Sequence, residues 1–217
     1  MTGSNLTREE ALERSANIAV DSYDITLDLT TGAETFTTSS TVRFSATPGS
    51  ETWLDFLGES VDRVVVGGED IAVEWDGARV RVPNLAAENE VRVDAVGRYM
   101  NTGEGLHRYH DPEDGETYLY THFEPTDARR VFACFDQPDL KAPFRISVSA
   151  PTGWLVRSNA EAEHSASEGA VTTTDFAPTL PISTYIVCVI AGPYHLVEDE
   201  WVSDDGRRVP LSLMCRP

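Results

Sequence analysis

The sequence predicts an all-β protein, an antiparallel β-sandwich with one short helix at its N-terminus. Three observations support this fold class. Apolar and polar residues alternate with a period of two in many short segments, Gly-containing turn signals separate these segments, and only the beginning of the chain carries a helical pattern. Many short strands with frequent turns are typical of two packed antiparallel sheets.

Residues 1–20 predict a short helical extension. Thr7 is followed three positions later by Glu10, the pattern of a capping box, and the residues from Arg8 to Ala16 are good helix formers. We expect this helix to decorate the surface of the β-domain.

The first two strands are predicted at residues 23–29 and 36–44. Tyr23, Ile25 and Leu27 share one face of the first segment, and the second segment places Phe36 and Phe44 on one face with hydroxyl side chains opposite. This alternation indicates a half-buried antiparallel pair joined at Thr31-Gly32.

The remaining strands are shorter. We expect them at residues 53–56, 61–66, 71–75, 90–96, 144–150, 154–158 and 171–174. Asp76-Gly77 predicts a hairpin that joins residues 71–75 to 78–82, and Asp205-Gly206 predicts a last one. The apolar run STYIVCVIAG at residues 183–192 predicts a long strand buried on both faces, whereas residues 97–115 are polar and predict an irregular loop.

Length and charge limit the possible functions. The 217 residues suffice for one large β-domain or two small ones, and we expect a single domain over residues 1–217. With 36 acidic and 17 basic residues, the net charge of −19 repels phosphate backbones and anionic lipid, so we expect neither nucleic acid nor membrane as a partner. Such a surface favours solubility or attracts cationic groups, for example the free ammonium of a peptide.

Two further features predict the cellular compartment of the protein. The N-terminus lacks the pattern of a secretory signal, and no segment has the length and apolarity of a membrane span, so we expect a cytoplasmic protein. Cys134, Cys188 and Cys215 are odd in number and widely spaced, and we expect reduced and mostly buried thiols.

No complete active site is visible in the residues alone. His107 and His110 are a weak metal candidate, because no third ligand is recognisable nearby. The sequence contains neither HExxH nor GxSxG, and its glycines do not form a phosphate-binding loop. We therefore expect function to arise from what the domain contacts.

The segment from Tyr118 to Phe144 carries a distinctive motif. It reads THFE at residues 121–124 and DARRVFACFDQPDLKAPF at residues 127–144. This pattern resembles the N-terminal-domain motif of the aminopeptidase N family of zinc metallopeptidases, close to TQFE and then DARR-F-PCFDEP-KA-F. The later run LPISTYIVCVIAGPYHLVE resembles the family's MSTYL strand, and SYDITLDL is similar to bacterial cytoplasmic members, so the resemblance extends along essentially the whole chain.

The resemblance implies a saddle-shaped β-domain that packs on a thermolysin-like catalytic domain. In the family, the GxMEN motif, the HExxH zinc motif with its downstream Glu, and a transition-state-stabilising Tyr follow this region. The catalytic zinc domain is therefore expected to be absent from residues 1–217, with zinc as a cofactor of the parent enzyme only. That enzyme would remove N-terminal amino acids from peptides by a zinc-activated water, and residues 1–217 alone would be inactive.

The resemblance also implies two substrate-binding residues. Glu124 matches the family Glu that binds the free α-ammonium of the peptide, and a carboxylate in a partly dry cleft suits that contact. His122 replaces the Gln that lines the pocket for the first side chain, a departure that changes the charge available there near neutral pH. Asp127, Arg129 and Arg130 are expected to hold the turn by pairing, because an Arg fork suits bidentate contacts with carboxylates.

An alternative from another class is a stand-alone β-sandwich that binds a carbohydrate or a protein through residues 97–115. A reading frame that continues beyond Pro217 into GxMEN and HExxH would favour the enzyme. We further expect the surface that meets a catalytic domain to be unusually apolar.

Overall fold

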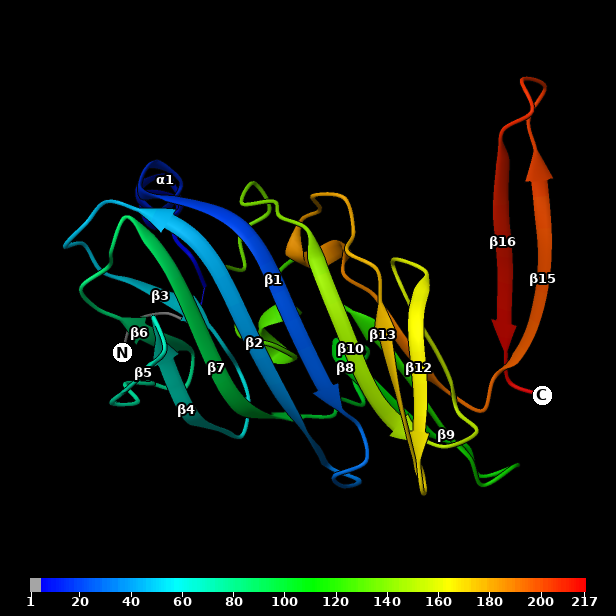
Figure 1. The fold of residues 1–217 in the computed structure, drawn as a ribbon. Helices are drawn as coiled ribbons and strands as arrows, with labels where there is room; N and C mark the ends of the chain where they lie inside the picture. The colour runs from blue at the N-terminus through cyan, green and yellow to red at the C-terminus, as the bar shows by residue number, and fades with distance from the viewer. Residues whose placement is uncertain (1–4) are drawn as a thin grey trace.

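The computed structural model describes residues 5–217 and confirms the all-β fold (Figure 1). The elements in order are α1 (Arg8–Asn17), β1 (Ile18–Asp28), β2 (Thr35–Ala46), β3 (Thr52–Asp55), β4 (Ser60–Val66), β5 (Glu69–Ile71), β6 (Arg79–Val82), β7 (Glu88–Arg98), β8 (Gly105–His110), β9 (Thr117–His122), the 3-10 helix η1 (Ala128–Arg130), β10 (Phe144–Pro151), β11 (Leu155–Ser158), β12 (Ala162–Glu168), β13 (Val171–Phe176), the 3-10 helix η2 (Thr184–Ile186), β14 (Val189–Gly192), β15 (His195–Val202) and β16 (Arg208–Cys215). Among residues 5–217, no helix is long and apolar enough to cross a lipid bilayer.

Two larger sheets form the body of the protein. One has eight strands in the order β12-β13-β10-β1-β2-β7-β4-β5, and the other has four in the order β11-β14-β9-β8. β3 pairs with β6, and β15 pairs with β16, in two-stranded sheets. Strand pairing is antiparallel except between β1 and β10, where Tyr23 lies beside Phe144 in a parallel register. This parallel pair is an exception within the antiparallel sandwich, and it brings residues 23–28 against residues 144–149, at the end of the motif.

Aromatic rings of the motif lie in the core. Phe132, Phe135 and Phe144 are fully buried, as is Tyr23 of β1. The rings of Tyr23 and Phe144 stack at 4.5 Å between centroids, and Phe135 meets Phe44 edge-on at 5.1 Å. Such ring pairs add to the free energy gained by burial. The motif is therefore part of the core that holds the large sheet.

Three of the predictions from local sequence patterns are wrong, because pairing between strands distant in the chain decides the structure there. Residues 72–74 are not a strand, because β6 forms its ladder with β3, and only Trp75 and Val80 bridge across the predicted Asp76-Gly77 hairpin. The run at residues 183–192 is not one long strand but η2 followed by the four-residue β14. Residues 97–115 are not a single loop, since they contain β8, whose ladder with β9 spans Gly105 to His110.

The helix α1 has the predicted capping box but is more than a decoration. The Thr7 hydroxyl accepts from the Glu10 N–H at 3.2 Å, and the Glu10 carboxylate accepts from the Thr7 N–H at 2.8 Å. Arg14 is only 3% exposed, and its Nη1 donates to Oδ2 of Asp55 on β3 at 3.0 Å. The expectation of a surface decoration is wrong because this helix is anchored by a buried charge, which an apolar pattern does not reveal.

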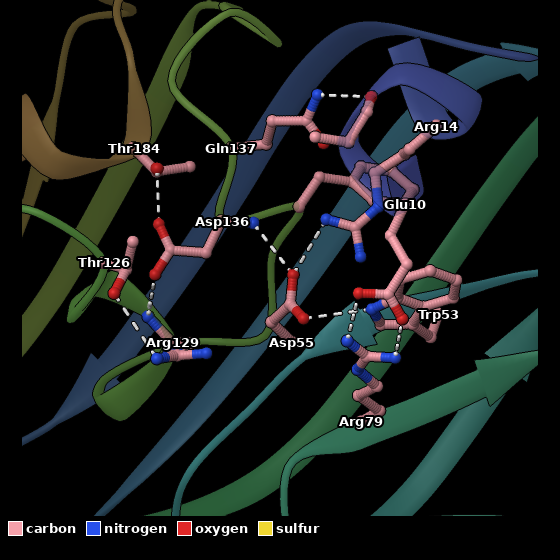
Figure 2. A network of polar contacts seen from close by, with 12 residues as sticks. Glu10, Arg14, Trp53, Asp55, Arg79, Thr126, Arg129, Asp136, Gln137 and Thr184 are labelled. Atoms are coloured by element: carbon pink, nitrogen blue, oxygen red, sulfur yellow. Dashed lines mark hydrogen bonds and ion pairs between the residues drawn. The ribbon is translucent and has the colours of Figure 1, made fainter. Parts of the chain in front are cut away.

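Asp55 is the centre of a buried polar network (Figure 2). Its Oδ2 accepts from Arg14 and from the backbone N–H of Asp136 at 3.2 Å, and its Oδ1 accepts from Trp53 Nε1 at 3.1 Å. Gln137 reaches α1 directly, because its Nε2 donates to the carbonyl of Ala11 at 2.9 Å. The network therefore joins α1, β3 and the CFDQP segment.

Asp136 extends this network to the DARR turn. Its Oδ1 accepts from the Thr184 hydroxyl at 2.7 Å, and its Oδ2 accepts from the Arg129 N–H at 3.3 Å. The pKa of this buried carboxyl is raised to about 6, chiefly by desolvation and also by the nearby charge of Asp55, against the lowering effect of the two hydrogen bonds. The folded protein thus binds a proton at Asp136 more tightly than the unfolded chain does.

We expect Arg14→Met to lower the free energy of unfolding by about 3–5 kcal/mol, because it leaves the Asp55 carboxylate buried without its cation. Urea denaturation followed by tryptophan fluorescence measures this change. Arg8→Met is the matched control, since Arg8 lies on the same helix and is exposed. Equal stability of the two variants would show that the buried pair does not hold α1.

Asp136→Asn is expected to change how stability depends on pH. Because the pKa of Asp136 is about 6 when folded and 3.8 ordinarily, the wild type loses stability relative to this variant as pH rises from 4 to 7. The full difference is about 3 kcal/mol, from 1.36 kcal/mol per pKa unit. Urea unfolding of both proteins at several pH values measures it.

Asp205→Asn is the control, because a hydrogen bond from Ser203 lowers the pKa of this exposed carboxyl. The effect of Asp205→Asn on the pH dependence of stability has the opposite sign, and it occurs below pH 4. A difference between wild type and Asp136→Asn that stays constant from pH 4 to 7 would contradict the assignment.

Candidate functional site

The candidate site is the end of β9 and the turn that follows it. Burial alternates here, since His122 and Glu124 are exposed while Phe123 between them is 2% exposed. Phe123 packs edge-on against Phe132 with ring centroids 5.8 Å apart. The buried ring fixes the strand end, so the two polar side chains on either side of it are directed outward.

Backbone contacts close the turn after Glu124. The Glu124–Pro125 peptide bond is cis, and the N–H of Asp127 donates to the carbonyl of Phe123 at 2.8 Å. The N–H of Arg130 then donates to the carbonyl of Asp127 at 3.1 Å, at the start of η1. Glu124 therefore lies on a closed turn and not on an open loop.

The side chains of His122 and Glu124 form no hydrogen bond or ion pair with another residue in the described part of the chain. Most other carboxylates of the motif have such partners, as the contacts of Asp127 and Asp136 show. The Glu124 carboxylate and the His122 ring are thus free to accept or donate a hydrogen bond to a group outside residues 5–217.

Arg130 connects this turn to the neighbouring strand. Its Nε donates to Asp127 Oδ1 at 2.7 Å, and its Nη2 lies 3.9 Å from Glu104. The stem of Arg130 covers Gly105, which is the cross-strand partner of His122. A Cβ at Gly105 would lie 3.0 Å from Arg130 Cβ, and the φ of +63° also favours glycine there. The structural roles expected for Asp127 and Arg130 are confirmed by these contacts.

Arg129 points the other way, into the protein. Its backbone N–H is held by Asp136, and its Nη2 donates to Thr126 at 3.4 Å and to Asn5 at 3.1 Å. Arg129 therefore fixes the turn to the core, and Arg130 fixes it to β8. Sequence reasoning did not find Asp55 or Arg14 as the supports of this arrangement, because both lie far from the motif in the chain.

The electrostatics of the turn favour a cation. Glu104, Asp127 and Glu124 contribute three carboxylates to this part of the molecule, and Arg130 compensates only part of that charge. Glu124 remains unneutralised at the exposed end of the strand. An ammonium group that approaches it gains a charge-assisted hydrogen bond.

His107 and His110 do not form a metal site. Both lie on β8, where residues three positions apart point to opposite faces of the strand. His107 Nδ1 accepts from the N–H of Gly103 at 3.1 Å, and its ring packs on Tyr120 with centroids 4.8 Å apart. Residues 5–217 contain no group of three or more His, Cys, Asp or Glu residues arranged to hold a metal ion.

A large groove lies away from the candidate turn, between α1 and the β3–β6 pair. It has a volume of about 690 Å³, and its walls include Trp53 and Trp75. Its charged residues are largely paired with one another, as Glu10 with Arg79 at 2.7 Å and Glu74 with Arg81 at 3.0 Å. These internal pairs leave little free charge to recognise a ligand.

Comparisons with known proteins identify the family. Residues 19–186 match the model of the peptidase M1 N-terminal domain. The chain is 46% identical to aminopeptidase N of Streptomyces lividans over 223 aligned residues, which cover all of this chain and 25% of that protein.

More distant relatives agree with this match. A probable M1 family aminopeptidase 1 of Encephalitozoon cuniculi is 40% identical over 68% of this chain and 17% of its own length, and human glutamyl aminopeptidase is 34% identical over 52% of this chain and 12% of its own length. The chain thus spans about a quarter or less of the length of these relatives. By its sequence and its fold, the chain belongs to the family of peptidase M1 N-terminal domains.

Proposed function

We propose that this chain is the N-terminal domain of a zinc-dependent aminopeptidase, in which Glu124 binds the free α-ammonium of a peptide substrate. The observation that carries the proposal is the exposed and unpaired Glu124 carboxylate on a closed turn inside the family-matched segment. The relatives named above are aminopeptidases, and an enzyme of that kind must recognise a free N-terminus. Residues 1–217 act as a single domain in this proposal.

His122 completes the substrate contact in this proposal. His122 is the last residue of β9 and Glu124 lies two residues later on the turn; both are exposed, on either side of the buried Phe123. We assign it to the wall of the pocket for the first side chain. Its cross-strand partner Gly105 is covered by the side chain of Arg130, so Arg130 borders this position.

The metal belongs to another part of the protein. Residues 5–217 provide no set of ligands that fits a zinc ion, so the proposal places zinc on a catalytic domain that packs on this one. The contribution of this chain is to hold the substrate's amino end. A fixed carboxylate also selects against peptides with a blocked N-terminus, because it would then face a group that cannot neutralise it.

In the complete polypeptide, we expect Glu124→Gln to raise KM for peptides with a free N-terminus by about 10- to 100-fold, the value of one hydrogen bond to a charged group. The value of kcat should change less, because the ammonium contact exists in both ground and transition states. Steady-state hydrolysis of aminoacyl anilides measures both constants. Glu113→Gln, at an exposed carboxylate of the β8–β9 turn, is the control, and equal KM values for the two variants would count against Glu124.

The purified chain of residues 1–217 should release no product from aminoacyl anilides in the presence of added Zn²⁺, since it lacks zinc ligands in this proposal. A chromogenic assay over hours, with circular dichroism to verify that the chain is folded, tests this. Turnover that depends on zinc would reveal a metal site within the chain.

A further inference from the structure

A pocket lies between the two larger sheets, at the end of the body where β1 and β10 finish (Figure 1). Pro151 of β10, Val171 of β13 and Leu29, the residue after β1, line it from the large sheet. Thr117 and Leu119 of β9 line it from the four-stranded sheet. Its volume is about 500 Å³, which is typical of pockets that bind small molecules.

The walls of this pocket are mostly apolar. Leu29 and Leu119 are buried, and Trp154 is partly exposed. Among the described residues, none of those that line the pocket is acidic, although 36 of the 217 residues of the chain are Asp or Glu. Asp28 lies next to Leu29 in the chain, but its Oδ1 accepts from the N–H and the hydroxyl of Thr30, at 2.9 Å and 2.6 Å. The pocket therefore lacks negative charge in a strongly acidic protein.

Arg108 is the charged residue of the pocket. Strand alternation on β8 puts it on the face of Leu106, which is fully buried, and not on the face of His107. Its Nη2 lies 3.4 Å from the hydroxyl of Thr117, and its Cζ lies 5.9 Å from the centroid of the Tyr99 ring. Within residues 5–217, the Arg108 guanidinium forms no ion pair with a carboxylate.

An unpaired guanidinium in apolar surroundings attracts an anion. Arg108 is only partly exposed, so water and salt screen a counter-ion beside it less than they screen one on an open surface. The planar fork of an arginine suits two parallel hydrogen bonds to a carboxylate. The apolar walls favour a ligand that carries this carboxylate on an apolar body.

A single negative charge fits the pocket better than two. Arg108 is the only basic residue among the described residues that line it, and the chain has a net charge of −19. A phosphate monoester, which carries nearly two negative charges at neutral pH, would keep one of them unneutralised in a repulsive field. A carboxylate is neutralised by Arg108 alone.

We propose that this pocket, the Arg108 pocket, binds a small amphipathic carboxylate, with the carboxylate group on Arg108 and the apolar chain against Leu29, Leu119 and Trp154. The Arg108 pocket is separate from the candidate turn, because Leu119 and His122 lie on opposite faces of β9. It is therefore a binding site that the proposed peptidase function does not require.

Calorimetric titration of the complete polypeptide with octanoate tests the site. We expect Arg108→Met to weaken octanoate binding by about 10- to 100-fold, because it removes one hydrogen-bonded charge pair and keeps most of the stem. Arg92→Met is the matched control, since Arg92 is exposed, pairs with Asp94 and does not line the pocket. It removes the same charge and should leave the affinity within about 2-fold of wild type, because salt screens distant exposed charges.

Two related ligands separate the contribution of the charge from that of the chain. Octan-1-ol has the same chain without a charge, so it should bind wild type more weakly than octanoate does, and the two should bind Arg108→Met about equally. Hexanoate should bind about 4-fold more weakly for each methylene that it lacks, which is the value of burying one methylene.

A conservative variant distinguishes lost charge from lost structure. Arg108→Lys keeps the charge but not the planar fork, so it should restore part of the octanoate affinity that Arg108→Met loses. Thermal unfolding followed by circular dichroism shows whether each variant is folded. If Arg108→Met does not fold, the preference for octanoate over octan-1-ol decides, and it should be smaller in Arg108→Lys than in wild type.

Wild-type protein that binds no octanoate at millimolar concentration would overturn the proposal. Equal octanoate affinity in wild type and Arg108→Met would do the same, as would equal binding of octanoate and octan-1-ol to wild type. Octanoate bound elsewhere in the complete polypeptide does not imitate the expected result, because the Arg108 and Arg92 variants share every other site.

Discussion

The buried carboxylate of Asp55 is the constraint on which the rest of this structure depends. It accepts hydrogen bonds from Arg14 on α1 and from the backbone of Asp136 in the motif, and it lies on β3 between them. Burying an ion pair has a large desolvation cost, which only good geometry and further hydrogen bonds offset. Here two donors of Arg14, Nε and Nη2, lack hydrogen-bond partners among the described residues, but the guanidinium lies 4.4 Å from the Trp53 ring and 5.5 Å from that of Phe135. Cation–π attraction therefore supplies part of the missing stabilisation.

This arrangement explains how a turn that bears free charges can be rigid. Arg129 and Asp136 are buried and hydrogen-bond to each other, while Arg130 pairs with Asp127 and Glu124 is exposed. Asp136 is held in turn by Thr184, which lies 48 residues away from it in sequence. A carboxylate that must bind a ligand cannot be neutralised by its own protein. The turn is consequently stabilised through its neighbours, and Glu124 remains unpaired.

The sequence was sufficient to predict those features that depend on local patterns. The alternation at Tyr23 to Leu29, the capping box at Thr7 and the motif at residues 118–144 all correspond to what the structure contains. It was insufficient where distant residues decide the outcome. The parallel pairing of β1 with β10 has no local signal, and β6 pairs with β3 instead of its sequence neighbour. β8 was hidden because its polar and aromatic residues do not alternate in hydrophobicity, although its ladder with β9 determines the surroundings of His122.

The candidate site and the Arg108 pocket share one physical property, which is that each contains a charge without a counter-ion among residues 5–217. A carboxylate or a guanidinium that its own protein does not neutralise remains available to a ligand of opposite charge. Tyr120 and His122 share one face of β9, and Tyr120 lines the cleft at the base of β16, whereas Leu119 lines the Arg108 pocket from the other face. In the proposed function, the cation that Glu124 lacks among residues 5–217 is the ammonium group of a bound peptide, so the unpaired carboxylate is what lets the turn select a free N-terminus.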